Sequence, residues 1–161
     1  MTPSVQLLAR LQFLCRVAEK ELRHLQTTDR RLFGEHLDAE LAARLDEDVE
    51  LAERVEAFVG RFGRLQDLLA DKLLPALLTA LGERVGPQLD NLDLAERLGY
   101  IATAEMWFTV RQLRNHMVHE YIEDPAILAD ALQSGHDFVP FLTAAVEAMV
   151  AEVCKRGWNE P

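Results

Sequence analysis

Apolar residues recur at every third or fourth position over most of this 161-residue chain, and this period most constrains its fold. Such spacing places the apolar residues on one face of an α-helix. The clearest stripe runs from Asp46 to Leu74, and no stretch of useful length alternates as a half-buried strand does. Leu, Ala, Glu and Arg, which favour helices, dominate the composition. The sequence therefore predicts an all-α, up-and-down bundle of five or six helices, with one long antiparallel pair, in a single domain spanning residues 1–161.

Capping residues and prolines set the expected boundaries in the first half of the chain. We expect a first helix over residues 4–25, followed by a break at Thr27-Thr28-Asp29 that supplies cap residues for the next segment. The long helix over 46–74 should end or kink at Pro75, because proline lacks an amide donor and clashes with the preceding turn. Residues 76–81 should continue as another turn or two of helix.

The middle of the chain begins with a loop marked by Gly82, Gly86 and Pro87. Asn91 or Asp93 is then expected to cap a short helix that reaches Leu98. Thr103 is expected to cap the next helix, over roughly residues 104–121.

The last part of the chain carries a strong start signal at Asp124-Pro125, where a capping residue precedes a proline at the first helical position. We expect this helix to run to about Ala131. Gly135 should then interrupt the pattern before a last helix over residues 137–155.

The chain is acidic, with a formal net charge of −10. This charge argues against a protein that coats nucleic acid without specificity, because neutralising phosphates requires many lysines and arginines. Residues 97–121, however, carry three basic and two acidic side chains and form the one stretch that is not acidic. A brief or guided encounter with an anionic substrate is compatible with that stretch, although chance alone can produce such a short window.

Cysteine usage and hydropathy indicate a cytoplasmic protein. Cys15 and Cys154 lie at opposite ends of the chain within apolar helical patterns, so we expect two free, buried thiols rather than a disulfide. Neither a CxxC motif nor a His/Cys cluster predicts a zinc site. The beginning of the chain lacks a signal-peptide pattern, and no apolar run approaches the roughly 18 residues that a membrane span needs.

One segment carries most of the residues suited to chemistry. On a helical wheel, Arg111, Asn115 and His119 follow one another at four-residue steps on one face. A different face holds the expected core stripe, which consists of Met106, Val110, Leu113, Met117 and Tyr121. Arg114 lies between these faces, about 140° from His119 on a straight helix. Both side chains can therefore reach one phosphate only through a local distortion or through a second copy of the helix in a two-fold dimer.

These residue types suit cleavage of RNA through its 2′-hydroxyl. That reaction needs a base for the 2′-proton and an acid for the leaving 5′-oxygen, and histidine performs either task near neutral pH. His119 is the candidate acid/base, and a dimer would supply two copies of it. Arg114 is the candidate phosphate ligand, which would stabilise the charge that builds on the phosphate. Asn115 is placed to orient the imidazole or hold the phosphate.

The segment from residue 114 to residue 121 reads R-N-H-M-V-H-E-Y. It resembles the R-x4-H-x-Y motif of the HepT-like branch of the HEPN superfamily, including the polar residue, Asn115, directly after the arginine. Trp107 and the downstream stretch D-F-V-P-F-L, residues 137–142, are also similar to that branch. The motif covers eight residues, whereas the expected helical layout resembles the family over most of the chain.

The resemblance implies an HEPN-like helical homodimer that acts as a metal-independent endoribonuclease, the toxin of a type II toxin–antitoxin module, without a cofactor. Arg114 and His119 of both subunits would form a composite site, with Asn115 as the orienting residue. The implied partner is an antitoxin with a minimal nucleotidyltransferase fold, which in some members inactivates the toxin by transferring AMP to the motif tyrosine, here Tyr121. Arg111 and His116, on the same helix, are candidate substrate-binding residues.

Two alternatives use the same fold. The chain is then either a catalytically silent substrate-binding or scaffold partner of a nucleotidyltransferase, or a purely structural helical adaptor. The intact Arg114–His119 pair favours the enzyme. His116 and His119 are three residues apart, but no third ligand at a suitable spacing predicts a metal site.

The other polar groups are expected to be ordinary surface residues. Four of them can be read as a partner-binding cluster but are interpreted as a solvated, salt-bridged helix face: Arg64, Asp67, Asp71 and Lys72. Three further histidines are expected at the surface, near helix ends or in loops: His24, His36 and His136.

Overall fold

A computed structural model describes residues 2–34, 36–119 and 124–160, with His119 described by its backbone alone. The described residues form helices and contain no strand, as expected. The elements are α1 (Val5–Leu32), α2 (Ala39–Ala43), α3 (Val49–Leu68), the π-helical turn η1 (Leu69–Leu73), α4 (Leu74–Ala80), α5 (Gln88–Leu98), α6 (Ala104–His119) and α7 (Pro125–Lys155). Because α3, η1 and α4 follow one another without a gap, the described helices form six rods, within the expected five or six.

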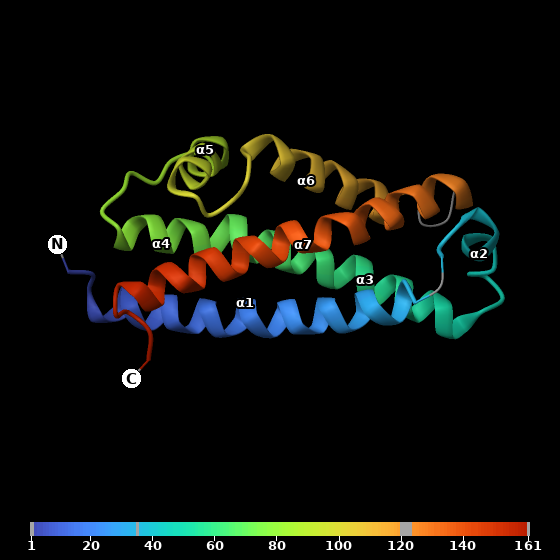
Figure 1. Ribbon diagram of the computed structural model, residues 1–161, viewed down its shortest axis with the longest axis horizontal. Helices are drawn as coiled ribbons and strands as arrows, with labels where there is room; N and C mark the ends of the chain where they lie inside the picture. Colours follow the sequence, from blue (N-terminus) through green and yellow to red (C-terminus); the bar gives the residue numbers. More distant parts are fainter. Residues whose placement is uncertain (1, 35, 120–123, 161) are drawn as a thin grey trace.

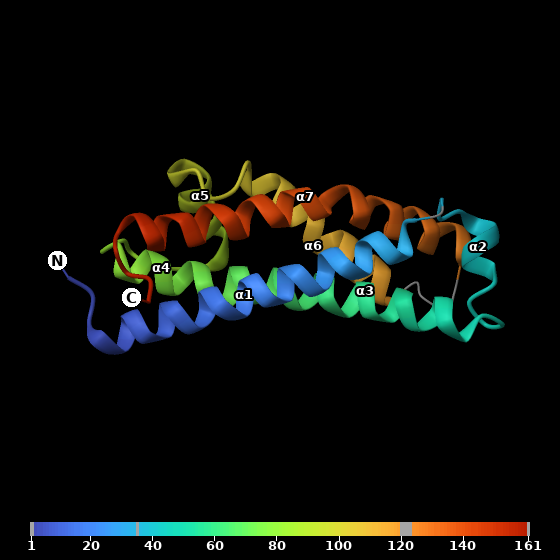
Figure 2. The ribbon, with the colours of Figure 1, turned by 60° about the horizontal axis from the view of Figure 1, so that its bottom comes forward.

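The rods form an elongated up-and-down bundle (Figure 1). α1 and the α3–η1–α4 rod run antiparallel side by side, in both views, and are the expected long pair (Figure 2). α7 packs along both of them, while α6 lies against α3 and α7. The start of α1 and the end of α7 lie at the same end of the molecule (Figure 1). In the described part of the chain, no helix combines the length and the apolar character needed to cross a membrane.

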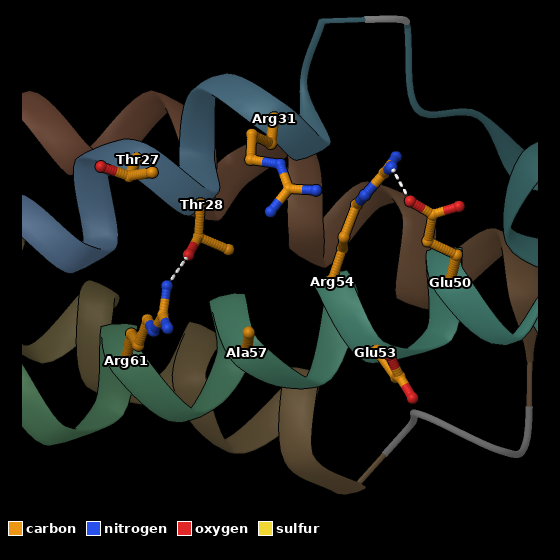
Figure 3. Close-up of a pocket in the computed structure, with 8 residues that line it drawn as sticks. All are labelled: Thr27, Thr28, Arg31, Glu50, Glu53, Arg54, Ala57 and Arg61. Carbon is orange, nitrogen blue, oxygen red and sulfur yellow. Dashed lines mark hydrogen bonds and ion pairs between the residues drawn. The ribbon is translucent and has the colours of Figure 1, made fainter.

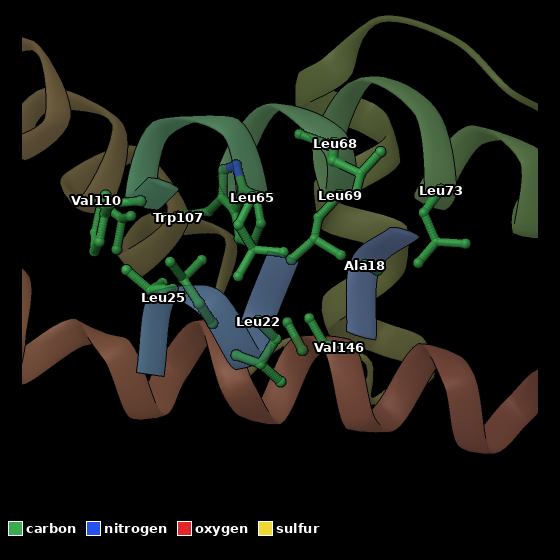
Figure 4. Close-up of a cluster of buried hydrophobic side chains, with 14 of the residues drawn as sticks. Ala18, Leu22, Leu25, Leu65, Leu68, Leu69, Leu73, Trp107, Val110 and Val146 are labelled. Carbon is green, nitrogen blue, oxygen red and sulfur yellow. The ribbon is translucent and has the colours of Figure 1, made fainter. Parts of the chain in front are cut away.

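Leucine side chains from α1, α3 and η1 fill the centre of the bundle (Figure 4). Leu22 and Leu25 of α1 face Leu65 and Leu69 of the neighbouring rod, and Trp107 of α6 closes the cluster from a third side (Figure 4). Burying each of these leucines stabilises the fold by about 1.5–3 kcal/mol. This packing fixes α6 against α3, and the contact between these two helices shapes the candidate site.

The expected break at Thr27-Thr28-Asp29 is wrong, because α1 continues through it to Leu32. The hydroxyls of Thr27 and Thr28 donate to carbonyl oxygens one turn earlier, at 2.9 and 3.0 Å, and so do not compete for the helical amides. Asp29 is buried and finds its partner in another helix, since its Oδ1 lies 2.7 Å from Nδ1 of His136 in α7. Tertiary contacts, which the sequence pattern does not display, thus lengthen α1.

Pro75 distorts the rod as expected. It stands at the start of α4, directly after the π-helical turn η1, which widens the backbone where the proline cannot donate a hydrogen bond. The rod therefore kinks without ending, and residues 74–80 continue as helix. The loop after α4 also falls where Gly82, Gly86 and Pro87 predict it.

The caps expected for α5 are wrong, since the helix begins at Gln88, before both Asn91 and Asp93. Asn91 is buried inside the helix, and its side-chain amide accepts from the Gly86 amide and donates to the Gly86 carbonyl, at 2.9 and 3.1 Å. The asparagine therefore secures the loop before α5 instead of capping the helix. The end of α5 at Leu98, followed by Gly99 with a φ of 84°, agrees with the prediction.

α7 starts at Pro125 behind an Asp124 cap, as expected, but it is one helix of 31 residues without the interruption predicted at Gly135. Gly135 is buried where α7 meets α3 and α6. An added Cβ would lie 3.1 Å from Cε1 of Phe58 and 3.2 Å from Sδ of Met117. This glycine therefore serves close helix packing and not chain reversal.

The two cysteines differ in exposure, so the expectation of two buried thiols holds for one of them. Cys15 is buried and Cys154 is exposed; both are free. Burial, with a smaller contribution from the charge of Glu19, raises the pKa of the Cys15 thiol to about 11. The neutral thiol therefore prevails in Cys15 at neutral pH, and it behaves as a small core residue.

Candidate functional site

The segment singled out by its chemistry lies on α6, which begins as the sequence predicts. The Thr103 hydroxyl accepts a hydrogen bond from the Met106 amide at 3.0 Å, which is the expected N-terminal cap. The helix then runs without interruption to His119, and the expected end at residue 121 lies outside the described residues. Trp107, Val110 and Met117 form its buried face.

Arg114 is the best-fixed polar side chain of the segment. Its Nη1 donates to Oδ1 of Asp67 in α3 at 2.8 Å, and its side chain retains 31% of its exposure. The guanidinium reaches Asp67 by crossing Gly63, one turn earlier on α3. A Cβ added to Gly63 would lie only 2.7 Å from Nε of Arg114. The glycine and the aspartate together hold Arg114 against α3, and its side chain stays partly exposed.

Arg111, one turn before, is held less directly. Its Nη1 donates to Oε1 of Gln88 at the start of α5, at 2.5 Å. The Gln88 amide in turn donates to Oδ1 of Asp71 in η1, at 2.7 Å. Arg111 is exposed, so its remaining donors face solvent. The two arginines of α6 are thus tethered to two carboxylates, Asp67 directly and Asp71 through Gln88.

The other polar residues of the segment lie at the surface. Asn115 and His116 are exposed, and neither side chain forms a hydrogen bond with another described residue. Asn115 continues the exposed stripe that Arg111 starts. The side chain of His119 and all of Tyr121 lie outside the described residues, so the predictions made for them stay predictions.

The backbone of α6 bears on how Arg114 and His119 can meet. The sequence left two routes, a local distortion of the helix or a second subunit. α6 is continuous α-helix from Ala104 to His119. Five residues of regular helix turn the chain by about 140° beyond a full revolution, so one straight α6 directs the two positions to different sides. The described backbone therefore contains no distortion between the two positions.

The side of the α3–η1 rod next to Asp67 is lined by alternating charges. A shallow groove of about 260 Å³ lies there between α1 and the rod, and its polar lining includes Glu21, Arg64, Asp71 and Lys72. Arg64 lies 3.7 Å from Glu21, and Asp67 holds Arg114. The four residues are at least partly exposed, as expected for a solvated face. The described ion pairs, however, join Arg64 to Glu21 and Asp67 to Arg114, and none joins two of the four.

Among the histidines, His24 and His36 are exposed as expected. His136 is half-buried, paired with Asp29 and stacked on the ring of Phe33 at a centroid distance of 4.4 Å, so its assignment to the surface is wrong. In the described ranges, no group of three His, Cys, Asp or Glu side chains is arranged to hold a metal ion.

Sequence reasoning missed the contributions of Gly63, Asp67 and Gln88 to this site. Gly63 gave a signal, because a glycine inside a strongly helical stretch often marks a close approach by another part of the chain. Asp67 stood in the polar cluster, but nothing in the spacing paired it with Arg114, 47 residues away.

Comparison with family models, with curated proteins and with solved structures found no match to this chain.

Proposed function

We propose that the chain is the HEPN-type toxin of a type II toxin–antitoxin module, a homodimeric and metal-independent endoribonuclease. One observation carries the proposal. The R-x4-H segment lies on a single helix whose arginine is held by Asp67 over Gly63, with 31% of its side chain exposed to solvent. A partly exposed, oriented guanidinium is suited to bind a phosphodiester through paired hydrogen bonds.

The proposed reaction is attack by the ribose on its own phosphate. A base takes the 2′-proton, the 2′-oxygen bonds to phosphorus, and the bond from phosphorus to the 5′-oxygen breaks as an acid protonates that oxygen. The products are a cyclic phosphate and a 5′-hydroxyl. His119 supplies the acid/base group, Arg114 binds the phosphate and stabilises its developing charge, and Asn115 orients the histidine or the phosphate.

The proposed active site forms between two subunits. Regular helix geometry separates Arg114 and His119 on one copy of α6, whereas an isologous dimer can bring the arginine of one copy towards the histidine of the other. Two copies of His119 would then serve as base and acid. The exposed Arg111 and His116 on the same helix would contact the RNA on either side of the scissile bond.

The proposed regulator is a minimal nucleotidyltransferase antitoxin. Transfer of AMP from ATP to the hydroxyl of Tyr121, two residues after His119, would release pyrophosphate and place a bulky anion next to the proposed catalytic histidine in the sequence. RNA would then be excluded by volume and by charge. Mass spectrometry of the chain after incubation with such an antitoxin and ATP should show one added AMP that Tyr121→Phe abolishes.

Induced expression and cleavage by the purified protein test the proposal. We expect wild type to arrest growth, and His119→Ala or Arg114→Ala to lower cleavage by at least about 100-fold. His36→Ala and Arg97→Ala, which remove the same side chains from exposed positions elsewhere, should cleave like wild type. Cleavage should persist in EDTA and should vary between about pH 5 and 8 with the ionisation of histidine.

The scaffold alternative also has a specific observation in its favour, namely that the carboxylate of Asp67 already occupies one edge of Arg114. It predicts that wild type without an antitoxin neither arrests growth nor cleaves RNA, while Arg114→Ala weakens binding to the nucleotidyltransferase. A monomer by analytical ultracentrifugation at micromolar concentration, together with undiminished cleavage, would contradict the composite site.

A further inference from the structure

A groove of about 270 Å³ lies between the last turns of α1 and the first half of α3 (Figure 3). It is separate from the Arg114 contact, because neither Gly63 nor Asp67 lines it and no described residue of α6 does. Its lining is rich in arginine although the chain as a whole is acidic. The residues that line it are Thr27, Thr28, Arg31, Glu50, Glu53, Arg54, Ala57 and Arg61.

Two of the three arginines in the groove keep a positive charge that no described carboxylate offsets. Arg61 donates to the Thr28 hydroxyl and, at 3.2 Å, to the His24 carbonyl, which are both neutral oxygens. Arg31 extends from α1 into the space between the two helices, and its guanidinium makes no ion pair with a described residue (Figure 3).

The carboxylates that line the groove do not form ion pairs with Arg31 or Arg61 in the described structure. Glu50 forms an ion pair with Arg54 at 2.6 Å, so these two charges offset each other. Glu53 projects from α3 away from α1 and from the space that Arg31 enters (Figure 3). Among the described arginines that line the groove, Arg31 and Arg61 are therefore the two without a described carboxylate partner.

A second groove of about 280 Å³ adjoins the first and shares Arg31 and Arg54 with it. Its own arginine, Arg44, lies 3.6 Å from Asp48, which lines the same groove. Arg31 thus stands at the junction of the two grooves. A ligand bound by Arg31 can extend into either of them.

We propose that the α1–α3 groove binds a phosphate group, with Arg31 and Arg61 as its cationic ligands. Guanidinium forks match the oxygens of phosphate, and the volume suits a phosphate with a small substituent better than a large apolar ligand. The phosphate can belong to the backbone of a single-stranded RNA or to a small phosphorylated molecule. Arg114 does not line this groove, so the phosphate ligands proposed here are distinct from the arginine of the proposed ribonuclease site.

Calorimetric titration of the full chain with inorganic phosphate tests the groove. We expect Arg31→Gln to weaken phosphate binding by about tenfold or more, the loss typical of a charge-assisted hydrogen-bond donor. Arg30→Gln, an exposed neighbour on α1 that lines neither groove, makes the same charge change and should alter the affinity less than about twofold. The phosphate affinity of Arg31→Lys should lie between those of Arg31→Gln and Arg30→Gln, because lysine keeps the charge and loses the planar guanidinium fork.

A short 2′-O-methyl RNA, which the 2′-hydroxyl route cannot cleave, separates the two sources of phosphate. Binding tighter than that of inorganic phosphate, with a salt dependence that weakens in Arg31→Gln, assigns the groove to an RNA strand. If the 2′-O-methyl RNA binds no more tightly than inorganic phosphate, the groove is assigned to a small phosphorylated ligand. Equal weakening by Arg31→Gln and Arg30→Gln, or equal weakening by Arg31→Gln and Arg114→Ala, would overturn the proposal.

Discussion

Two arginines on opposite sides of α3, Arg114 and Arg61, are held in opposite ways. On the side that faces α6, Arg114 donates to the carboxylate of Asp67, so its charge is offset where it is held. On the side that faces α1, Arg61 donates to a hydroxyl and a carbonyl, so it is held without losing its charge. The same helix thus presents a neutralised guanidinium on one side and a charged guanidinium on the other.

This difference separates two functions of an arginine that lies between helices. A carboxylate partner orients the guanidinium but competes with an incoming phosphate. Neutral partners orient it less strongly and leave its attraction for anions intact. The α6 side therefore favours a well-oriented group that acts in a reaction, and the α1 side favours a group that binds.

The largest effect is expected from Gly63→Ala. The new Cβ would lie 2.7 Å from Nε of Arg114, so the guanidinium must move away from its position beside Asp67. If Arg114 acts in cleavage, a displacement of about 1 Å lowers the rate by about 100-fold. The melting temperature should stay near that of wild type, because the gain in helix propensity offsets the weakened ion pair.

Gly60→Ala is the matched control for this substitution. It lies three residues earlier on α3, and its added Cβ would lie 3.8 Å from the nearest side chain, an ordinary contact. It should gain the same helix propensity while cleavage stays unchanged. Equal rates for the two variants would show that the position of Arg114 does not control the reaction.

A smaller effect is expected from Arg61→Gln on the opposite side of the helix. The loss of the bonds to Thr28 and His24, which join α3 to α1, should lower the free energy of unfolding by about 1–2 kcal/mol. Urea denaturation measures this change. Arg64→Gln, at an exposed position 3.7 Å from Glu21, should cost less than about 0.5 kcal/mol. If Arg64→Gln is the more destabilising variant, the neutral oxygens do not hold Arg61 as described.

A small change in stability is expected from Asp67→Asn. Both partners of this ion pair are partly exposed, so its loss should cost at most about 0.5–1 kcal/mol. The same change leaves Arg114 with an unbalanced charge. The 2′-O-methyl RNA should therefore bind the variant more tightly than wild type and with a steeper salt dependence. The same salt dependence is expected for RNA bound in the α1–α3 groove.

Asp93→Asn removes the same charge from an exposed position on α5 and is the control. Fluorescence anisotropy at several salt concentrations compares the two variants. An equal gain in affinity would mean that overall charge, and not the partner of Arg114, governs binding on this side.

The start of α6 shows what local sequence signals predict well. Thr103 caps the helix, and Pro75 distorts the rod before α4, because in both cases one side chain acts on its own backbone within a turn. The sequence signals that gave wrong predictions also consist of a few neighbouring residues. Thr27-Thr28-Asp29 and Gly135 look like helix breaks, yet both lie inside long helices.

These failures have one physical cause. Asp29 is stabilised within α1 by His136 of α7, and Gly135 is needed where α7 packs on Phe58 and Met117. Polar and small residues that favour a turn in isolation are retained in a helix when another helix satisfies or requires them. Such partners lie far along the chain, and a local pattern does not name them.

The helical period and the positions of Arg111, Arg114 and Asn115 around α6 can be worked out from the amino-acid order, because each residue advances a regular helix by a fixed angle. Which oxygen each arginine meets became known from the folded chain. Arg114 finds its carboxylate 47 residues away, and Arg61 finds its hydroxyl 33 residues away. Contacts over such separations depend on how whole helices pack, and they decide whether a guanidinium keeps its charge for a ligand.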